Sequence, residues 1–146
     1  MGLFDKIFSS SSNSNLSKPE AFAGIMLATV AADGHISDEE VAGFNAVISR
    51  MKLFQTQSAS EHLAMIDKLF GILKRSSAKE LLTKSAEVLP SELREAAFAV
   101  SADLIFADGS VEEEEKVLLE TLQQQLGIPD DLAMQVVRVM EVKNRN

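Results

Sequence analysis

Apolar side chains recur every three or four positions along most of the chain, which is the spacing of an amphipathic helix. Residues 20–32 are almost continuously apolar and predict a helix that is buried on all sides. No stretch of useful length alternates apolar and polar residues as a half-buried strand does. The pattern therefore predicts an all-α fold, a single bundle of about seven helices over residues 17–32, 37–52, 58–75, 77–89, 90–108, 112–126 and from 129 onward.

Five of these helices carry an apolar face, and we expect these faces to form the core. The residues predicted to point inward are Val41, Phe44, Val47, Ile48 and Met51; Leu63, Ile66, Leu69, Phe70 and Leu73; Leu93, Ala96, Ala97, Val100, Leu104 and Ile105; Val117, Leu118 and Leu122; and Leu132, Val136, Val137 and Met140.

A short acidic sequence occurs twice, at an offset of 75 residues, each time between two predicted helices. Its glycine permits the positive φ angle with which many helices end. In the first copy, Ser37 and Glu40 have the spacing of a capping box, in which each side chain binds a backbone N–H at the start of a helix. The bundle is thus predicted to be built around two helix–acidic turn–helix units. The copies read Ala32-Asp33-Gly34, then Ile36 and Glu40, and Ala107-Asp108-Gly109, then Val111 and Glu115.

Each turn matches the second half of an EF-hand loop, with a glycine, an apolar anchor and a closing glutamate. The first half of the loop is missing in both copies. Thr29 and Ala31 occupy its first two ligand positions in one copy, and Leu104 and Phe106 occupy them in the other. Since Ca²⁺ takes six or more oxygen ligands, neither turn is a normal EF-hand.

A cation site shared between the turns is the remaining functional interpretation of the carboxylates. Asp103 lies within an otherwise apolar helix, and the first unit has Ala28 at the corresponding position. The competing interpretation is structural, with turn-forming aspartates, a capping glutamate and a helix start at residues 112–115 that acidic side chains favour. If the turns converge, the ligands of a divalent cation would be Asp33, Glu40, Asp103, Asp108 and Glu115.

Composition excludes several other functions. The net charge of −8 argues against nucleic acid as a partner, because phosphate binding needs a basic face, and it favours cations or a basic protein surface. Cysteine is absent, which excludes disulfides and thiolate chemistry. His35 and His62 are the only histidines, and neither has the spacing that would activate a nucleophile. We therefore predict no catalytic residues and no enzymatic activity.

Residues 1–17 differ in composition from the predicted helical domain at residues 18–142 and the short tail at 143–146. The Ser/Asn-rich stretch within them is typical of a flexible tether. The segment before it either packs on the domain or touches a membrane surface or a partner protein. Because no apolar run reaches the roughly 18–20 residues that span a bilayer, we expect a cytoplasmic protein, with peripheral contact at the inner membrane face as the second alternative. The residues that would make this contact are Leu3, Phe4, Ile7 and Phe8.

The two Ala-Asp-Gly turns, each followed by an apolar residue and a glutamate, resemble the tellurite-resistance TerB family. They also resemble the TerB-like domain at the N-terminus of a membrane-tethered DnaJ-type co-chaperone. The resemblance covers about residues 20–138 and implies a bundle of about seven helices without enzymatic activity. It further implies metal-binding acidic clusters, at the five carboxylates named above, and a stress-response function within multi-protein, often membrane-associated complexes. We therefore expect a domain that binds a divalent cation and docks partner proteins. The alternative is a purely structural protein–protein interaction scaffold with no metal site.

Overall fold

The computed structural model describes residues 16–32, 34, 36–107 and 109–145. Leu3, Phe4, Ile7 and Phe8 lie outside this part. The described residues form helices and no strand, which confirms the all-α prediction. The helices are α2 (Lys18–Ala31), α3 (Asp38–Arg50), α4 (Lys52–Gln55), α5 (Ala59–Arg75), α6 (Ala78–Val88), α7 (Ser91–Ile105), α8 (Glu113–Leu126) and α9 (Asp130–Lys143).

Seven of these helices match the predicted ones to within a few residues. The exception is α4, a single turn of four residues between α3 and α5. Such a segment is too short to display a helical period in its sequence. Its Phe54 is buried and meets Phe22 of α2 edge to face, with 6.2 Å between the ring centroids.

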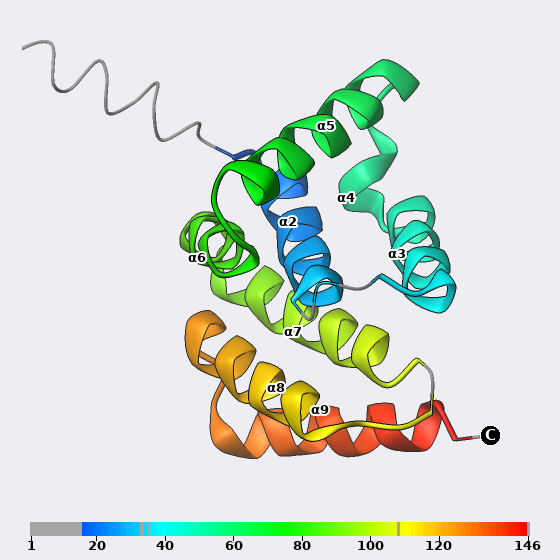
Figure 1. Ribbon diagram of the computed structural model, residues 1–146, viewed down its shortest axis with the longest axis vertical. Coiled ribbons are helices and arrows are strands. Elements are labelled where there is room, and N and C mark those ends of the chain that lie inside the picture. Colours follow the sequence, from blue (N-terminus) through cyan, green and yellow to red (C-terminus); the bar gives the residue numbers. More distant parts are fainter. Residues whose placement is uncertain (1–15, 33, 35, 108, 146) are drawn as a thin grey trace, which may run out of the picture.

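Helix α2 forms the centre of one half of the bundle (Figure 1). Residues 21–30 of α2 are all buried, as the continuous apolar sequence predicted. α2 packs most extensively on α6 and α7, and also contacts α3, α4 and α5. On the opposite side, α7 contacts α8 and α9, so α7 joins the two halves. The two predicted units therefore correspond to α2–turn–α3 and α7–turn–α8.

Several predicted core positions are exposed, and the prediction was wrong there. On α5, the neighbouring helices bury Met65, Leu69 and Ile72, whereas two other apolar side chains of this helix remain in water. Periodicity shows that a helix has an apolar face but not how much of that face its neighbours cover. The exposed residues are Val41, Leu63, Phe70 and Val117.

Helix starts follow the sequence signals closely. α2, α3 and α5 each begin with a reciprocal capping box between a serine and a glutamate three residues later. At the start of α6, the Glu80 N–H donates a hydrogen bond to the Ser77 hydroxyl. Among the described residues, no helix combines the length and the apolar composition needed to cross a bilayer.

Candidate functional site

The first acidic turn leads from α2 into α3. Gly34 has φ of 79°, and its N–H donates to the carbonyl of Ala31 at 3.0 Å. The Ser37 N–H donates to Oε1 of Glu40 at 2.9 Å, and the Glu40 N–H donates to the Ser37 hydroxyl at 3.1 Å. This confirms the predicted capping box. The Glu40 carboxylate thus caps α3, while Asp33 and His35 lie outside the described residues.

The second acidic turn leads from α7 into α8 and repeats the same geometry. Gly109 has φ of 87°, and its N–H donates to the carbonyl of Phe106 at 2.9 Å. The Glu112 N–H donates to Oε1 of Glu115 at 3.0 Å, so Glu115 has the role that Glu40 has in the first turn. Glu112 stands at the N-cap, where the first unit has a serine. Asp108 lies outside the described residues.

Asp103 connects α7 to the end of α9. Its Oδ1 accepts hydrogen bonds from Nζ of Lys143 at 3.1 Å and from Nδ2 of Asn144 at 2.8 Å. The same Asn144 amide also donates to the carbonyl of Met140 at 2.9 Å. The Asp103 side chain is 31% exposed, and these partners compensate for the part of its hydration that the neighbouring helices remove. Sequence reasoning missed these partners, which lie 40 and 41 residues further along the chain.

The structure gives Glu40, Asp103 and Glu115 three separate sets of contacts. The part of the chain that the structure describes contains no group of three or more histidine, aspartate or glutamate side chains placed to hold a metal ion. Two of the five predicted ligands, Asp33 and Asp108, lie beyond that part. The cation site shared between the turns therefore stays a prediction.

The C-terminal end of α2, in the first unit, lies close to α8 of the second unit. A hollow of about 180 Å³ lies where α2, α6 and α8 meet. Ala32, directly before the first turn, lines this hollow together with Leu118 and Thr121 of α8. The start of the first turn is thus close to the middle of α8, the helix that follows the second turn.

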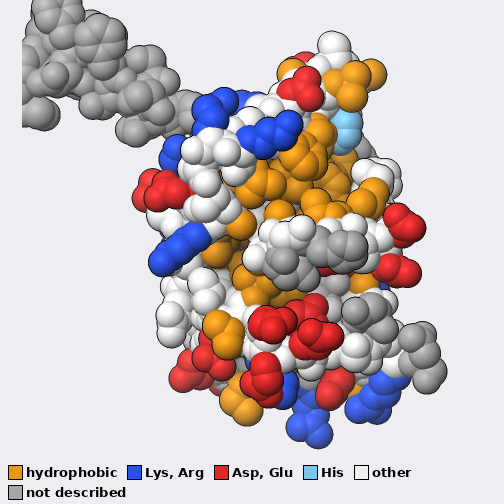
Figure 2. Space-filling model, in the orientation of Figure 1, with side chains coloured by type: hydrophobic (Ala, Val, Ile, Leu, Met, Phe, Trp, Pro, Cys, Tyr) orange, Lys and Arg blue, Asp and Glu red, His pale blue; other side chains and the backbone are white. Residues whose placement is uncertain are grey.

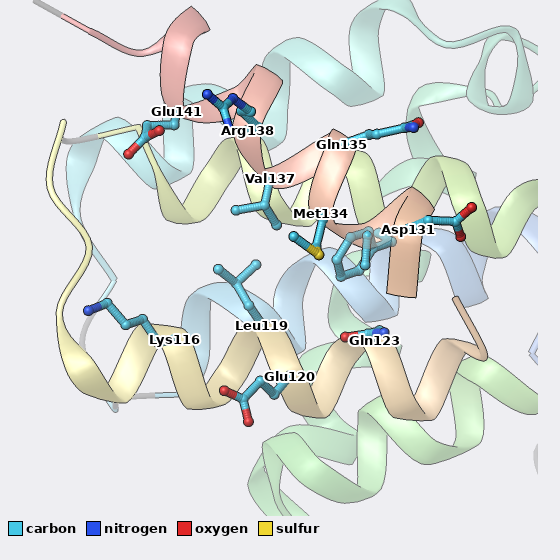
Figure 3. Close-up of a pocket in the computed structure, with 12 residues that line it drawn as sticks. Lys116, Leu119, Glu120, Gln123, Asp131, Met134, Gln135, Val137, Arg138 and Glu141 are labelled. Carbon is cyan, nitrogen blue, oxygen red and sulfur yellow. The ribbon is translucent and has the colours of Figure 1, made fainter. Parts of the chain in front are cut away.

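A groove of about 680 Å³ lies between α8 and α9 (Figure 3). Leu119 of α8 faces Val137 and Met134 of α9 across it. Met134 is 73% exposed, whereas Leu119 is buried. The groove thus has an apolar floor between two polar rims. Its rim residues are Lys116, Glu120, Gln123, Asp131, Gln135, Arg138 and Glu141.

The groove continues toward the second acidic turn. A neighbouring hollow of about 450 Å³ is lined by Gly109 and Val111 of that turn and by Asn144 after α9. Lys116 and Glu141 line both this hollow and the groove. The turn and the groove therefore form one connected surface. Sequence reasoning missed the groove, although α9 gives a signal for it, since apolar residues lie on more than one of its faces.

The protein is thus a small all-α domain in which two glycine-containing acidic turns each precede a helix that begins with a glutamate capping box. Residues 19–131 match the family model described as "Tellurite resistance protein TerB". The match covers more than half of the chain, and the protein belongs to this family. The matched residues end near the start of α9, so most of α9 lies beyond them. Neither the curated proteins nor the solved structures include a significant match.

Proposed function

We propose that this protein is a non-enzymatic TerB-family domain of the tellurite-resistance type that docks a partner protein in the α8–α9 groove and binds a divalent cation through its acidic turns. The connected surface formed by the groove and the second turn is the observation that carries this proposal. The absence of cysteine and the isolation of the two histidines in the sequence favour a binding function over catalysis.

The shape of the groove fits an amphipathic helix of a partner protein. Such a helix lays apolar side chains at positions i, i+3, i+4 and i+7 into an apolar groove. Met134 and Val137 are about one turn apart on α9, and both face Leu119 of α8. Together these three side chains form a continuous apolar surface along the groove. The net charge of −8 favours a partner whose polar face is basic, because opposite charges speed association and exclude wrong partners.

The docking proposal is tested with a fluorescent, basic, amphipathic helical peptide titrated with the protein in an anisotropy assay. We expect saturable binding that Met134→Glu weakens at least tenfold, because the charge replaces an apolar side chain that lines the groove. Val117→Glu is the matched control, since Val117 is a 60% exposed apolar residue of α8 that does not line the groove. Equal affinities for the two variants would contradict docking in this groove.

The cation proposal rests on the carboxylates that the turns bring to the starts of α3 and α8. It is tested by thermal melts after chelator treatment, with Ca²⁺, Mg²⁺, Mn²⁺ and Zn²⁺ added back separately. Binding to the folded state alone raises the free energy of unfolding by about 2.7 kcal/mol at a hundredfold excess over Kd. We expect a saturable rise in Tm for one ion that Asp108→Asn with Glu115→Gln abolishes. No shift for any ion at millimolar concentration would favour the scaffold without a metal site.

A further inference from the structure

Helix α5 carries a second apolar stripe beside the one that packs into the core. The buried stripe consists of Met65, Leu69 and Ile72. The second stripe has spacings of three, four and three residues, which is the spacing of a seam between packed helices. Two of its members are 65% and 37% exposed, and the other two are half-buried. The residues of this stripe, called the α5 stripe below, are Leu63, Ile66, Phe70 and Leu73.

Hydrophobic side chains gather around the α5 stripe on one face of the molecule. Figure 2 shows them in the area bordered by α5 on one side and by α3 and α4 on the other. Met51 and Leu53, at the start of α4, are only partly buried. The main helix contacts of α5 are with α2 and α6, on its buried stripe. Exposed apolar side chains that gather on one face in this way are typical of a binding site.

We propose that residues 1–8 dock on the α5 stripe as a short amphipathic helix. These residues lie outside the described part of the structure, but their sequence has the spacing of an apolar helix face. Leu3, Phe4, Ile7 and Phe8 fall on one face of a helix, separated by steps of one, three and one residues. Packing this face on the α5 stripe removes two apolar surfaces from water at once, which is the main driving force of helix association.

The position at which the chain enters the domain places the segment within reach. Leu16 is buried, and two residues later α2 begins. Glu20 of its first turn accepts a hydrogen bond from Nζ of Lys68 at 3.0 Å, which holds the start of α2 against the middle of α5. Lys68 lies between Ile66 and Phe70 in the sequence, on another face of the same helix.

The tether is long enough to reach around α5 to the stripe. Residues 9–15 are all serine or asparagine and span at most about 23 Å when extended. An α-helix with its side chains is about 10–12 Å across, so this length suffices to pass around it. A tether of this length also gives a millimolar effective concentration, so weak contacts are enough to keep the segment docked.

Docking on the α5 stripe makes the apolar face of residues 1–8 unavailable to any other surface. A lipid bilayer or a partner protein that takes up this face must compete with the stripe, because the same side chains cannot serve both. The segment thus has two alternative positions, docked on the stripe or released from it. A ligand shifts the equilibrium toward the released position only to the extent that it binds the released segment more tightly than the docked one.

The test uses the full chain with the substitution Phe4→Trp. The chain contains no tryptophan and no tyrosine, so this side chain is the only indole reporter. We expect blue-shifted emission without lipid and protection from acrylamide quenching. Adding Leu63→Ser and Phe70→Ser to this variant should red-shift the emission and raise the quenching constant several-fold. Val139→Ser, which removes an exposed apolar side chain of α9 that does not line the α8–α9 groove, is the matched control and should change neither property.

Three results would overturn the proposal. The first is a red-shifted, freely quenched tryptophan in the parent variant. The second is a blue shift that appears only when phosphatidylglycerol vesicles are added, which assigns the segment to membranes. The third is a blue shift that disappears on dilution, which assigns the stripe to a second copy of the chain. Leu63→Ser alone, at a position already 65% exposed, guards against misfolding of the double variant and should still red-shift the emission.

Discussion

Helix α2 packs closely on α6 at Gly24. A Cβ atom built on Gly24 would collide with Oγ of Ser85, while its next neighbours, Leu81 Cδ1 and Leu69 Cδ2, are at ordinary distances of 3.4 and 3.5 Å. Ser85 is fully buried, and its hydroxyl has no hydrogen-bond partner among the described residues. One oxygen atom therefore decides whether this site accepts a methyl group.

The substitution Gly24→Ala sets two effects against each other. Overpacking a core costs about 1–3 kcal/mol. Replacing glycine by alanine inside a helix stabilises it by about 1 kcal/mol. Taking about 2 kcal/mol for the collision, we expect a net loss of about 1 kcal/mol in the free energy of unfolding. For a chain of this size that corresponds to a Tm lower by about 3 °C.

The substitution Ser85→Ala should reverse the sign of this effect. Alone, it removes a buried hydroxyl without a partner, and such a group costs about 1–3 kcal/mol, so the variant should be at least as stable as the wild type. In the Ser85→Ala background, Gly24→Ala meets no collision and should stabilise the protein by about 1 kcal/mol. The expected coupling between the two sites is thus about 2 kcal/mol, within the range known for residues in contact.

The measurement is urea denaturation of the four proteins of this double-mutant cycle, followed by far-UV circular dichroism. Gly71→Ala is the matched control, because a Cβ there meets only the flexible Arg75 side chain, with Nη1 at 3.1 Å. This control should gain about 1 kcal/mol from helix propensity alone. If Gly24→Ala gains as much as Gly71→Ala, and Ser85→Ala does not alter the gain, the close packing of α2 on α6 is refuted.

Two further predictions concern helix starts. Ser37→Ala removes the cap of α3 and should lower the free energy of unfolding by about 1 kcal/mol in urea melts; Ser49→Ala, an exposed residue near the end of the same helix, is the control and should change it far less. Burial opposes ionisation of Glu20, but the Ser17 N–H and the Lys68 ammonium outweigh it and hold the pKa of Glu20 below its ordinary value of 4.5. Ionised Glu20 therefore stabilises the fold fully above about pH 4.5, and this stabilisation is lost as the pH falls through the lowered pKa. The stability difference between wild type and Glu20→Gln should shrink over that range, and a constant difference would contradict the assignment.

The candidate site was predictable only in its local parts. The capping role of Glu40 follows from its spacing to Ser37, because a capping box lies within four residues of one chain. The ends of α2 and α7 near Gly34 and Gly109 were also predictable, because glycine readily adopts the positive φ angle that ends a helix. By contrast, the bonds from Lys143 and Asn144 to Asp103 join α7 to α9, and no local pattern encodes them.

The α8–α9 groove and the exposed α5 stripe were likewise not predictable from local sequence patterns. Both arise because an apolar helix face is wider than the surface its neighbours cover. The sequence showed that Leu63, Phe70 and Val117 are apolar and have helical spacing, but the inward orientation predicted for them was wrong. Their exposure depends on which helices lie beside α5 and α8, and the spacing of apolar residues along one helix does not determine that arrangement.

By itself, the amino-acid sequence determined the all-α class, seven of the helices, the capping box of α3, the burial of α2 and the two acidic turns. These features depend on interactions between residues within about one helical turn or on the period of a single segment. Only the tertiary structure decided the position of α4, the partners of Asp103, the contact of Gly24 with Ser85 and the groove beside the second turn. Those features depend on how helices far apart in the sequence pack, because side-chain volume and neighbouring surfaces, rather than periodicity, determine which apolar faces are covered.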